Sequence, residues 1–431
     1  MGPFKFALKM LKLEYKKTFF YAFTLVVTVA VVFVFFNYAY NPYLGNTATQ
    51  TTQAVTANVN SVNFSTALSM VMITLAILAA CYSNSVYLNK KTNEIAIEGI
   101  SGGSIVEIAE YLMAQNLAVG LIAIPVGLLL GFLLNPIVNK FLFNSLAVEG
   151  SLWYVDSEAM ALTIVYIFTQ IFAITLINTG FAYRNDILTL LNMDSSIKPL
   201  KPNTGIRMPV IIYFILYFIP FIIYFNGLPD VMNYIFYSLI GIYGIYGLYS
   251  RGLAWLLEKV QNKFNLSKPI ALISVGNLKY SIVKTKSLVL MICFSIVALM
   301  GYCIKYISSP SDYSIIYISY IVCIILMTLM ILYKIMLEND SHAHIFKSLY
   351  KLGYTSKQIR KIIKKEVFYY YALILFFISS YAVPILVHFV NIGTVSAIYA
   401  VKQFALYFVP IAFSGFIAYY NYKIAVFHKE G

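Results

Sequence analysis

Residues 18–40, TFFYAFTLVVTVAVVFVFFNYAY, decide the fold class because this stretch contains no Asp, Glu, Lys or Arg. About 20 consecutive apolar residues form a helix that crosses the roughly 30 Å hydrocarbon core of a bilayer. The rest of the chain has the same character, since 60% of its 431 residues are hydrophobic and only 11% are charged. A soluble domain carries about 25% charged residues. The sequence therefore predicts an all-α, polytopic membrane protein.

Ten stretches of this kind are expected to cross the membrane, in an arrangement of four, two and four helices. They are residues 18–40, 65–87, 116–134, 160–182, 209–225, 231–249, 287–307, 313–335, 367–390 and 404–422. The first is too long for the core of a signal peptide and lacks a cleavage site of small residues, so we expect it to remain as an anchor.

The positive charges of the chain, whose net charge is +14, lie in alternate loops between these stretches. The basic segments are residues 5–17, 90–91, 184–207, 251–286, 347–365 and 423–429. Residues 41–63 and 226–230, by contrast, contain no Lys or Arg. Basic loops stay on the cytoplasmic side. We therefore expect a multi-pass protein of the bacterial cell membrane with both termini in the cytoplasm. Because these charges suit the headgroups of membrane lipids, no nucleic-acid partner is expected.

An internal repeat organises the chain. Residues 8–12, a basic segment before the first crossing, parallel residues 275–279, and residues 95–108 parallel residues 346–359. Each basic segment is expected to form a helix in the membrane interface before its crossing. The repeat predicts three parts: a first four-helix half at 1–187, two connecting helices with their linkers at 188–268, and a second four-helix half at 269–431.

The loop after the second crossing of the first half has a local pattern of helix signals. Residues 94–98 are expected to form a short helix, which Gly102 and Gly103 end because glycine readily takes a positive φ. Ser104 and Glu107 then form a capping box, in which each side chain binds the backbone N–H of the other. A new helix is expected to begin directly after Ser104 and to continue into the third crossing.

The corresponding loop of the second half repeats these signals with different residues. Gly353 matches Gly102, Thr355 matches Ser104, and Gln358 matches Glu107. Two interpretations of this pair of loops remain open. They are ordinary helical hairpins, or each presents a stiff helix to a cytoplasmic partner and transmits motion into the next crossing. On the second reading, the candidate coupling residues are Glu94, Ile95, Ile97, Gly102, Ser104, Glu107, Ile345, Phe346, Leu349, Leu352, Gly353, Thr355 and Gln358.

These two motifs, at residues 94–104 and 346–359, resemble the signature of FtsX-like permeases, the membrane subunits of the ABC transporters that include the macrolide exporters. The order of four, two and four crossings resembles the bacitracin-resistance branch of that family. That branch carries a large extracytoplasmic domain between its seventh and eighth crossings, whereas here only about five residues, around 308–312, join them. Capture of a substrate by such a domain is therefore not expected.

The resemblance implies a separate cytoplasmic ABC ATPase that docks on both motifs, with two copies for each permease chain. ATP and Mg²⁺ are then bound by that partner, and no cofactor by this chain. The sequence agrees, since it contains no Gly-Lys dipeptide and hence no phosphate-binding loop of the Walker type. Residues 99–103 match G-x-S-x-G, but that elbow needs a preceding strand. No catalytic or metal-binding residue is predicted, and the substrate-binding residues are unknown.

The sequence leaves two functions open for a membrane subunit that works with such an ATPase. In the first, the chain is a permease that exports or removes an amphipathic substrate, such as a peptide, a bacteriocin or a lipid carrier. In the second, it is a signalling module that relays the motion of the ATPase to another membrane protein without transport. A secondary transporter is disfavoured, because no ionisable residue lies near the middle of a predicted crossing.

Overall fold

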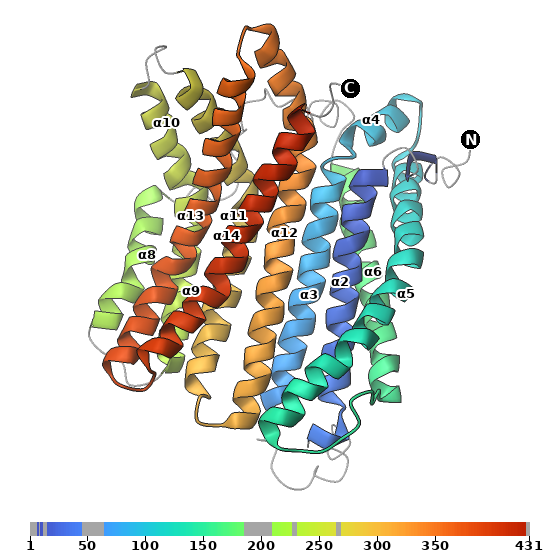
Figure 1. Cartoon of the computed structure of the whole chain (residues 1–431). Coiled ribbons are helices and arrows are strands. Elements are labelled where there is room, and N and C mark those ends of the chain that lie inside the picture. Colours follow the sequence, from blue (N-terminus) through green and yellow to red (C-terminus); the bar gives the residue numbers. More distant parts are fainter. Residues whose placement is uncertain are drawn as a thin grey trace. The chain divides into compact units, whose positions relative to one another are not determined.

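The computed structural model describes residues 7, 9–11, 15–44, 64–184, 209–225, 231–263 and 269–427. In these ranges the regular structure is helical and no strand occurs (Figure 1), which confirms the predicted all-α membrane fold. The helices are α2 (Tyr15–Ala39), η1 (Pro42–Leu44), α3 (Phe64–Leu88), α4 (Thr92–Ile100), α5 (Ile105–Leu146), α6 (Ser157–Arg184), α8 (Val210–Phe225), α9 (Val231–Gly247), η3 (Leu248–Gly252), α10 (Leu253–Lys263), α11 (Pro269–Lys305), α12 (Pro310–Lys351), α13 (Ser356–Asn391) and α14 (Ala397–Phe427).

Eight of the described helices are long and apolar enough to cross a membrane: α2, α3, α5, α6, α11, α12, α13 and α14. The two connecting helices form where they were predicted, but α8 has 16 residues and α9 has 17. At 1.5 Å per residue, helices of that length span about 25 Å, slightly less than the hydrocarbon core. Helix α9 continues through the π-helix η3 into α10. That α8 and α9 each cross the bilayer stays a prediction.

The chain divides into two compact units. The first contains α2 to α6 and the first turns of α12, and the second contains α8 to α11, the rest of α12, α13 and α14. The predicted boundaries after residues 187 and 268 fall at residues outside the described ranges, so the three-part division stays a prediction.

In the first unit, α2 packs against α3, α5 and α6. The contact between α2 and α5 is close because Gly127 and Gly131 face α2. A Cβ atom at Gly127 would lie 2.8 Å from the Val29 side chain, and one at Gly131 would lie 2.9 Å from Phe33. These two glycines are therefore packing residues, as a small-xxx-small pair in a membrane helix predicts.

Helix α5 is longer than the predicted crossing at 116–134, since it runs from Ile105 to Leu146. Residues 135–146, which follow that predicted crossing, are therefore helical as well. The short loop that follows is held by asparagine side chains. Asn37 Nδ2 donates to Asn135 Oδ1 at 2.8 Å, and Asn135 Nδ2 donates to the carbonyl of Tyr154 at 2.9 Å. The buried amides of Asn37 and Asn135 are thus satisfied within the protein.

In the second unit, α11 packs against α13, α9 and α10. The glycines of α9 allow α8 to approach closely, because a Cβ atom at Gly244 would lie 2.6 Å from the backbone nitrogen of Tyr217. Tyr381 on α13 donates its hydroxyl to the carbonyl of Tyr217 at 2.7 Å. Helix α11 has no break, so the interfacial helix predicted before its crossing is not a separate element. Of the N-terminal counterpart, residues 8–12, the structure describes residues 9–11, which are helical.

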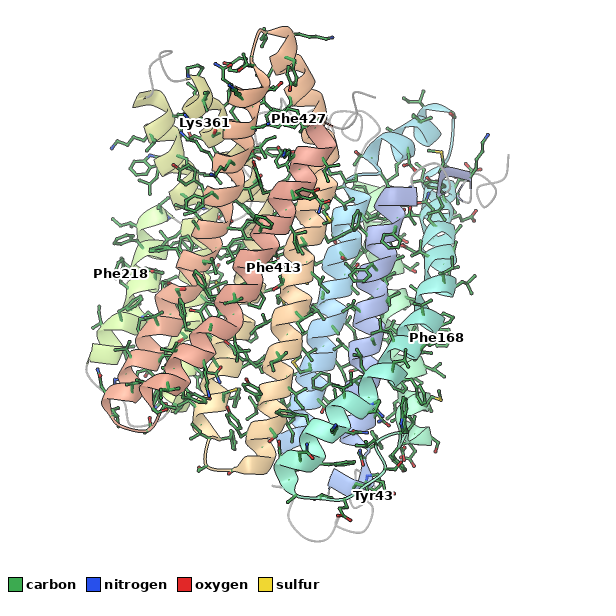
Figure 2. All side chains as sticks on the ribbon, in the orientation of Figure 1. Tyr43, Phe168, Phe218, Lys361, Phe413 and Phe427 are labelled. Carbon is green, nitrogen blue, oxygen red and sulfur yellow. The ribbon has the colours of Figure 1, made fainter. Side chains whose placement is uncertain are left out.

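Large apolar side chains cover the outside of each unit. Phe168 on α6 is 67% exposed and Phe413 on α14 is 62% exposed; both are labelled in Figure 2. Exposed phenylalanines in the middle of long apolar helices suit lipid rather than water. The surface of each unit therefore agrees with a multi-pass membrane protein.

Candidate functional site

The first predicted motif forms a capped turn between α4 and α5. Helix α4 ends at Ile100, and Gly102 has a φ of 91°. The backbone N–H of Glu107 donates to Ser104 Oγ at 3.2 Å, and the N–H of Ser104 donates to Glu107 Oε2 at 2.7 Å. Both halves of the predicted capping box are therefore present, and α5 begins where the sequence places it.

The second motif forms the same turn between α12 and α13. Gly353 has a φ of 90°. The N–H of Gln358 donates to Thr355 Oγ1 at 3.4 Å, and the N–H of Thr355 donates to Gln358 Oε1 at 2.9 Å. The end of α12 is closed by backbone bonds from Gly353 to Tyr350 (3.0 Å) and from Tyr354 to Leu349 (3.1 Å), the pattern of a Schellman motif.

The two motifs differ in the helix that precedes the turn. In the first unit α3 ends at Leu88, and the separate nine-residue helix α4 follows. In the second unit α12 runs without a break from Pro310 to Lys351, so residues 345–351 are its last turns. The short helix implied by the first motif is thus a separate element in only one of the two described motifs.

Each motif is anchored by a buried apolar side chain at the matching position. Ile95 is fully buried in a cluster with Ala7, Leu88, Ile108 and Tyr111. Phe346, at the position equivalent to Ile95, is also fully buried, and its ring packs edge-on against Tyr422 of α14 at 5.8 Å. These anchors tie each capped turn to the helices of its own unit.

Buried polar groups lie next to the anchor in the first unit. Lys91 forms an ion pair with Glu94 at 3.0 Å, and their side chains are 0% and 8% exposed. Tyr111 on α5 donates its hydroxyl to Glu94 at 2.5 Å, and Gln115 donates to the Tyr111 hydroxyl at 2.6 Å. A buried carboxylate is stable when it is paired and hydrogen-bonded, so this network joins α4 firmly to α5.

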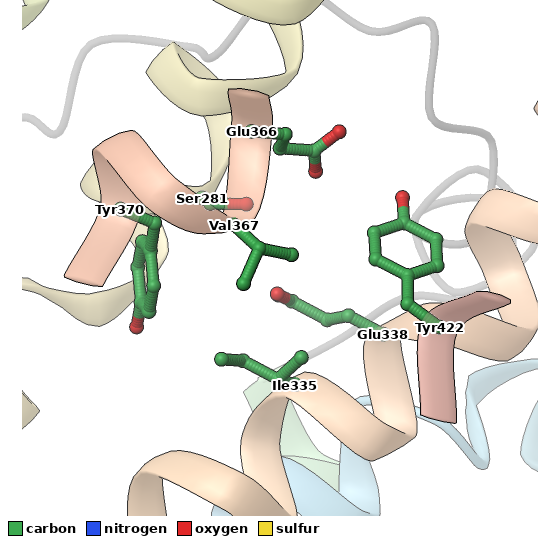
Figure 3. A pocket seen from close by; sticks show the side chains of 7 residues that line it. All are labelled: Ser281, Ile335, Glu338, Glu366, Val367, Tyr370 and Tyr422. Carbon is green, nitrogen blue, oxygen red and sulfur yellow. The ribbon is translucent and has the colours of Figure 1, made fainter. Parts of the chain in front are cut away.

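A second set of buried polar groups lies in the other unit. Lys334 forms an ion pair with Glu338 at 3.3 Å on α12, and Glu366 on α13 accepts a hydrogen bond from Asn277 on α11 at 3.0 Å. Figure 3 shows Glu338, Glu366 and Tyr422 around one small pocket. Its volume is about 20 Å³, enough for a single water molecule. This cluster was not predicted from the sequence, although Lys334 and Glu338 have the spacing of a helical ion pair.

The predicted coupling residues fall into three groups by exposure. Exposed are Ile97, Gly102, Ser104, Glu107, Leu352, Gly353 and Thr355, and Gln358 is half-buried. Buried are Glu94, Ile95, Phe346 and Leu349. Residue Ile345 belongs to α12, but its side chain lies outside the described residues. The exposed residues form the outer face of each turn, and the buried ones attach it to the helices beneath.

Two exposed apolar side chains at the first turn were not among the predicted residues. Ile100 is 63% exposed and Val106 is 66% exposed, and Ile97, which was predicted, is 56% exposed. Both residues flank the turn in the sequence. They were not predicted because the sequence does not show which apolar side chains are exposed.

The fold defines an all-α, multi-pass membrane protein, and comparison with known proteins narrows the class. No family model matches the chain. Over 190 residues, 44% of its length, the chain is 23% identical to the bacitracin export permease protein BceB of Bacillus subtilis and 25% identical to that of Halalkalibacterium halodurans. The match spans 28% of the length of each relative. This distant similarity supports an ABC-transporter permease family.

Proposed function

We propose that this chain is an FtsX-like permease subunit that couples ATP hydrolysis by a separate ABC ATPase to export or removal of an amphipathic peptide. The observation that carries the proposal is the pair of capped turns, each leading into a long continuous helix. Helix α5 has 42 residues and α13 has 36. No proline interrupts the backbone hydrogen bonds of α5 before Pro125 or those of α13 before Pro384. Motion applied at the turn is therefore carried rigidly along this first part of each helix and into its crossing.

The docking surface in this proposal is the exposed face of each turn. Ile97, Ile100 and Val106 supply apolar contact area at the first turn, and Leu352, 75% exposed, supplies it at the second. Gly102 and Gly353 have open space around them, so the backbone itself is accessible to a partner. Two turns of the same design accommodate two copies of one ATPase, which would bind ATP and Mg²⁺.

The substrate class is supported by the names of the relatives, which are bacitracin export permeases. Both names describe permeases, so they also support a transport subunit rather than a catalytic enzyme. Because the match covers a minor part of each relative, the peptide substrate and the ATPase remain proposals for this chain.

Docking can be tested by placing a charge on each exposed apolar surface. A candidate ABC ATPase is co-expressed with this chain, and Ile97→Glu or Leu352→Glu is introduced into the full chain. An unpaired carboxylate buried in an interface is costly. We expect the dissociation constant to rise at least about ten-fold, equivalent to about 1.4 kcal/mol. Leu349 is unsuitable for this test because it is buried.

The matched control is Leu256→Glu on α10, where the leucine is 49% exposed but lies outside both turns. This variant is expected to retain the ATPase. If Ile97→Glu and Leu352→Glu bind the ATPase as tightly as the unmodified chain, the turns are not its docking surface.

Transport and relay are separated by reconstitution of the complex in liposomes. Net movement of an amphipathic peptide with stimulated ATP hydrolysis supports the permease role. Stimulation that needs a second membrane protein and occurs without peptide movement contradicts it and supports the signalling module.

A further inference from the structure

An apolar groove runs between α13 and α14 on the surface of the second unit. Its volume is about 810 Å³, within the range of roughly 300–1,000 Å³ found for ligand sites. The groove exists because its floor has small side chains and its edges have large ones. Ala372 and Ala412 lie on the floor, and Phe368 and Phe416 stand beside it at 66% and 68% exposed.

The contact beneath the groove keeps the two helices close at one level. A Cβ atom at Gly415 would lie 3.0 Å from the ring of Tyr371, so α14 meets α13 there without a side chain of its own. Helices α13 and α14 therefore cannot approach each other more closely at the level of the alanines. The groove is thus a consequence of how the two helices pack.

The inside of the groove offers little polar recognition. Ser379, which lines it, shares a hydrogen bond with the hydroxyl of Tyr407 at 3.1 Å. A peptide entering from the bilayer would need partners for its backbone N–H and C=O groups. An acyl chain has no such groups, so the groove suits a lipid tail better than a peptide.

One end of the groove is basic. Lys364 lines it, and Arg360 lies one turn earlier on the same face of α13. The guanidinium of Arg360 stacks over the ring of Phe427 on α14 at 5.0 Å, so both cations face the helix that forms the other wall. The acidic residue of this stretch, Glu366, is buried and accepts its hydrogen bond from Asn277 of α11. The charge at the mouth is therefore positive.

We propose that this groove binds one anionic phospholipid, with its phosphate between Arg360 and Lys364 and an acyl chain along the α13–α14 floor. The headgroup belongs to the leaflet on the basic side of the chain. Charge complementarity selects an anionic headgroup over a zwitterionic one, because each basic residue near the surface of an anionic membrane is worth about 1 kcal/mol. This site is independent of the proposed transport of peptide.

The site is tested on the full chain, purified in detergent and titrated with phosphatidylglycerol or phosphatidylcholine of identical acyl chains. Binding is counted by native mass spectrometry. We expect tighter binding of phosphatidylglycerol, and Lys364→Gln is expected to weaken it about five-fold while leaving phosphatidylcholine unchanged. Lys259→Gln, which removes an exposed cation of α10, is the control and is expected to change neither.

A second variant tests the floor of the groove. Ala412→Phe fills the hollow from an exposed position, so it is expected to reduce binding of phosphatidylglycerol at least about five-fold without loss of helix content by circular dichroism. Ala161→Phe, at an exposed alanine of α6, is the matched control and is expected to bind lipid normally.

Three outcomes overturn the proposal. They are equal binding of the two lipids, normal binding by both Lys364→Gln and Ala412→Phe, and displacement of the lipid by millimolar inorganic phosphate, which would mean that only the phosphate is recognised. Retention of phosphatidylglycerol in the presence of phosphate supports a lipid site.

Discussion

At the scale of single residues, Gly102 and Gly353 set the direction in which α5 and α13 leave their turns. Both have a φ near 90°, a conformation that L-residues avoid by about 1–2 kcal/mol. Their positions were predicted because the signals lie within a few residues of each other: a glycine, then a hydroxyl side chain, and then a Glu or Gln three positions later. The exposure of neighbouring side chains was not predictable in this way.

Replacement of Gly353 by alanine is expected to destabilise the protein by about 1–2 kcal/mol. No atom lies within 4 Å of the added Cβ, so the cost comes from the backbone alone. Gly353→Asn is expected to cost less, because asparagine tolerates a positive φ. The measurement is the midpoint of thermal unfolding in detergent.

Gly180 provides the matched control, since it also has open space around it but lies within helix α6. Gly180→Ala is expected to be neutral or to stabilise by up to about 1 kcal/mol, through helix propensity. Equal midpoints for Gly353→Ala and Gly180→Ala would contradict the assignment of strain to Gly353.

At the scale of helices, some of the close contacts depend on glycine, as between α2 and α5 and between α8 and α9. Hydrophobic burial supplies little drive in a bilayer, because lipid tails are as apolar as the protein interior, and tight packing replaces it. Gly127 illustrates this on α5, where the backbone carbonyl of Val26 would lie 2.9 Å from an added Cβ. Neither helix can yield at such a point without a shift of the backbone.

Gly127→Ala is therefore expected to destabilise the first unit by about 1–3 kcal/mol through overpacking. The control is Gly120→Ala on the same helix, where the nearest atom to an added Cβ is the flexible Cδ1 of Ile124 at 3.8 Å. Thermal unfolding of both variants in detergent gives the comparison. A midpoint for Gly127→Ala equal to that of Gly120→Ala would show that the α2–α5 contact adapts freely.

At the scale of the whole molecule, the distribution of basic residues predicts which end of each helix faces the cytoplasm. The predicted number of crossings depends on whether α8 and α9 each cross the bilayer. The four cysteines lie within apolar helices, and Cys293, Cys303 and Cys323 are buried. They can be replaced to give a background in which a single introduced cysteine reports its own side of the membrane.

In that background, Asn226→Cys, between α8 and α9, is expected to react with a membrane-impermeant maleimide added outside intact cells. Lys402→Cys is the control expected to react from outside, and Lys357→Cys is expected to react only after the cells are permeabilised. The reason is that positive loops stay inside. Labelling of Asn226→Cys only after permeabilisation would mean that α8 and α9 do not cross.

The sequence by itself determined the helical membrane class and the two capped turns. Long apolar stretches have one stable form in lipid, and the capping boxes at Ser104 and Thr355 are local interactions. The tertiary structure alone decided that Leu349 is buried while Leu352 is exposed, that α12 continues to its turn without a break, and that Lys334 pairs with Glu338 inside the second unit. The physical reason is that lipid and protein interior are equally apolar, so periodicity along a membrane helix carries little information about which face is buried.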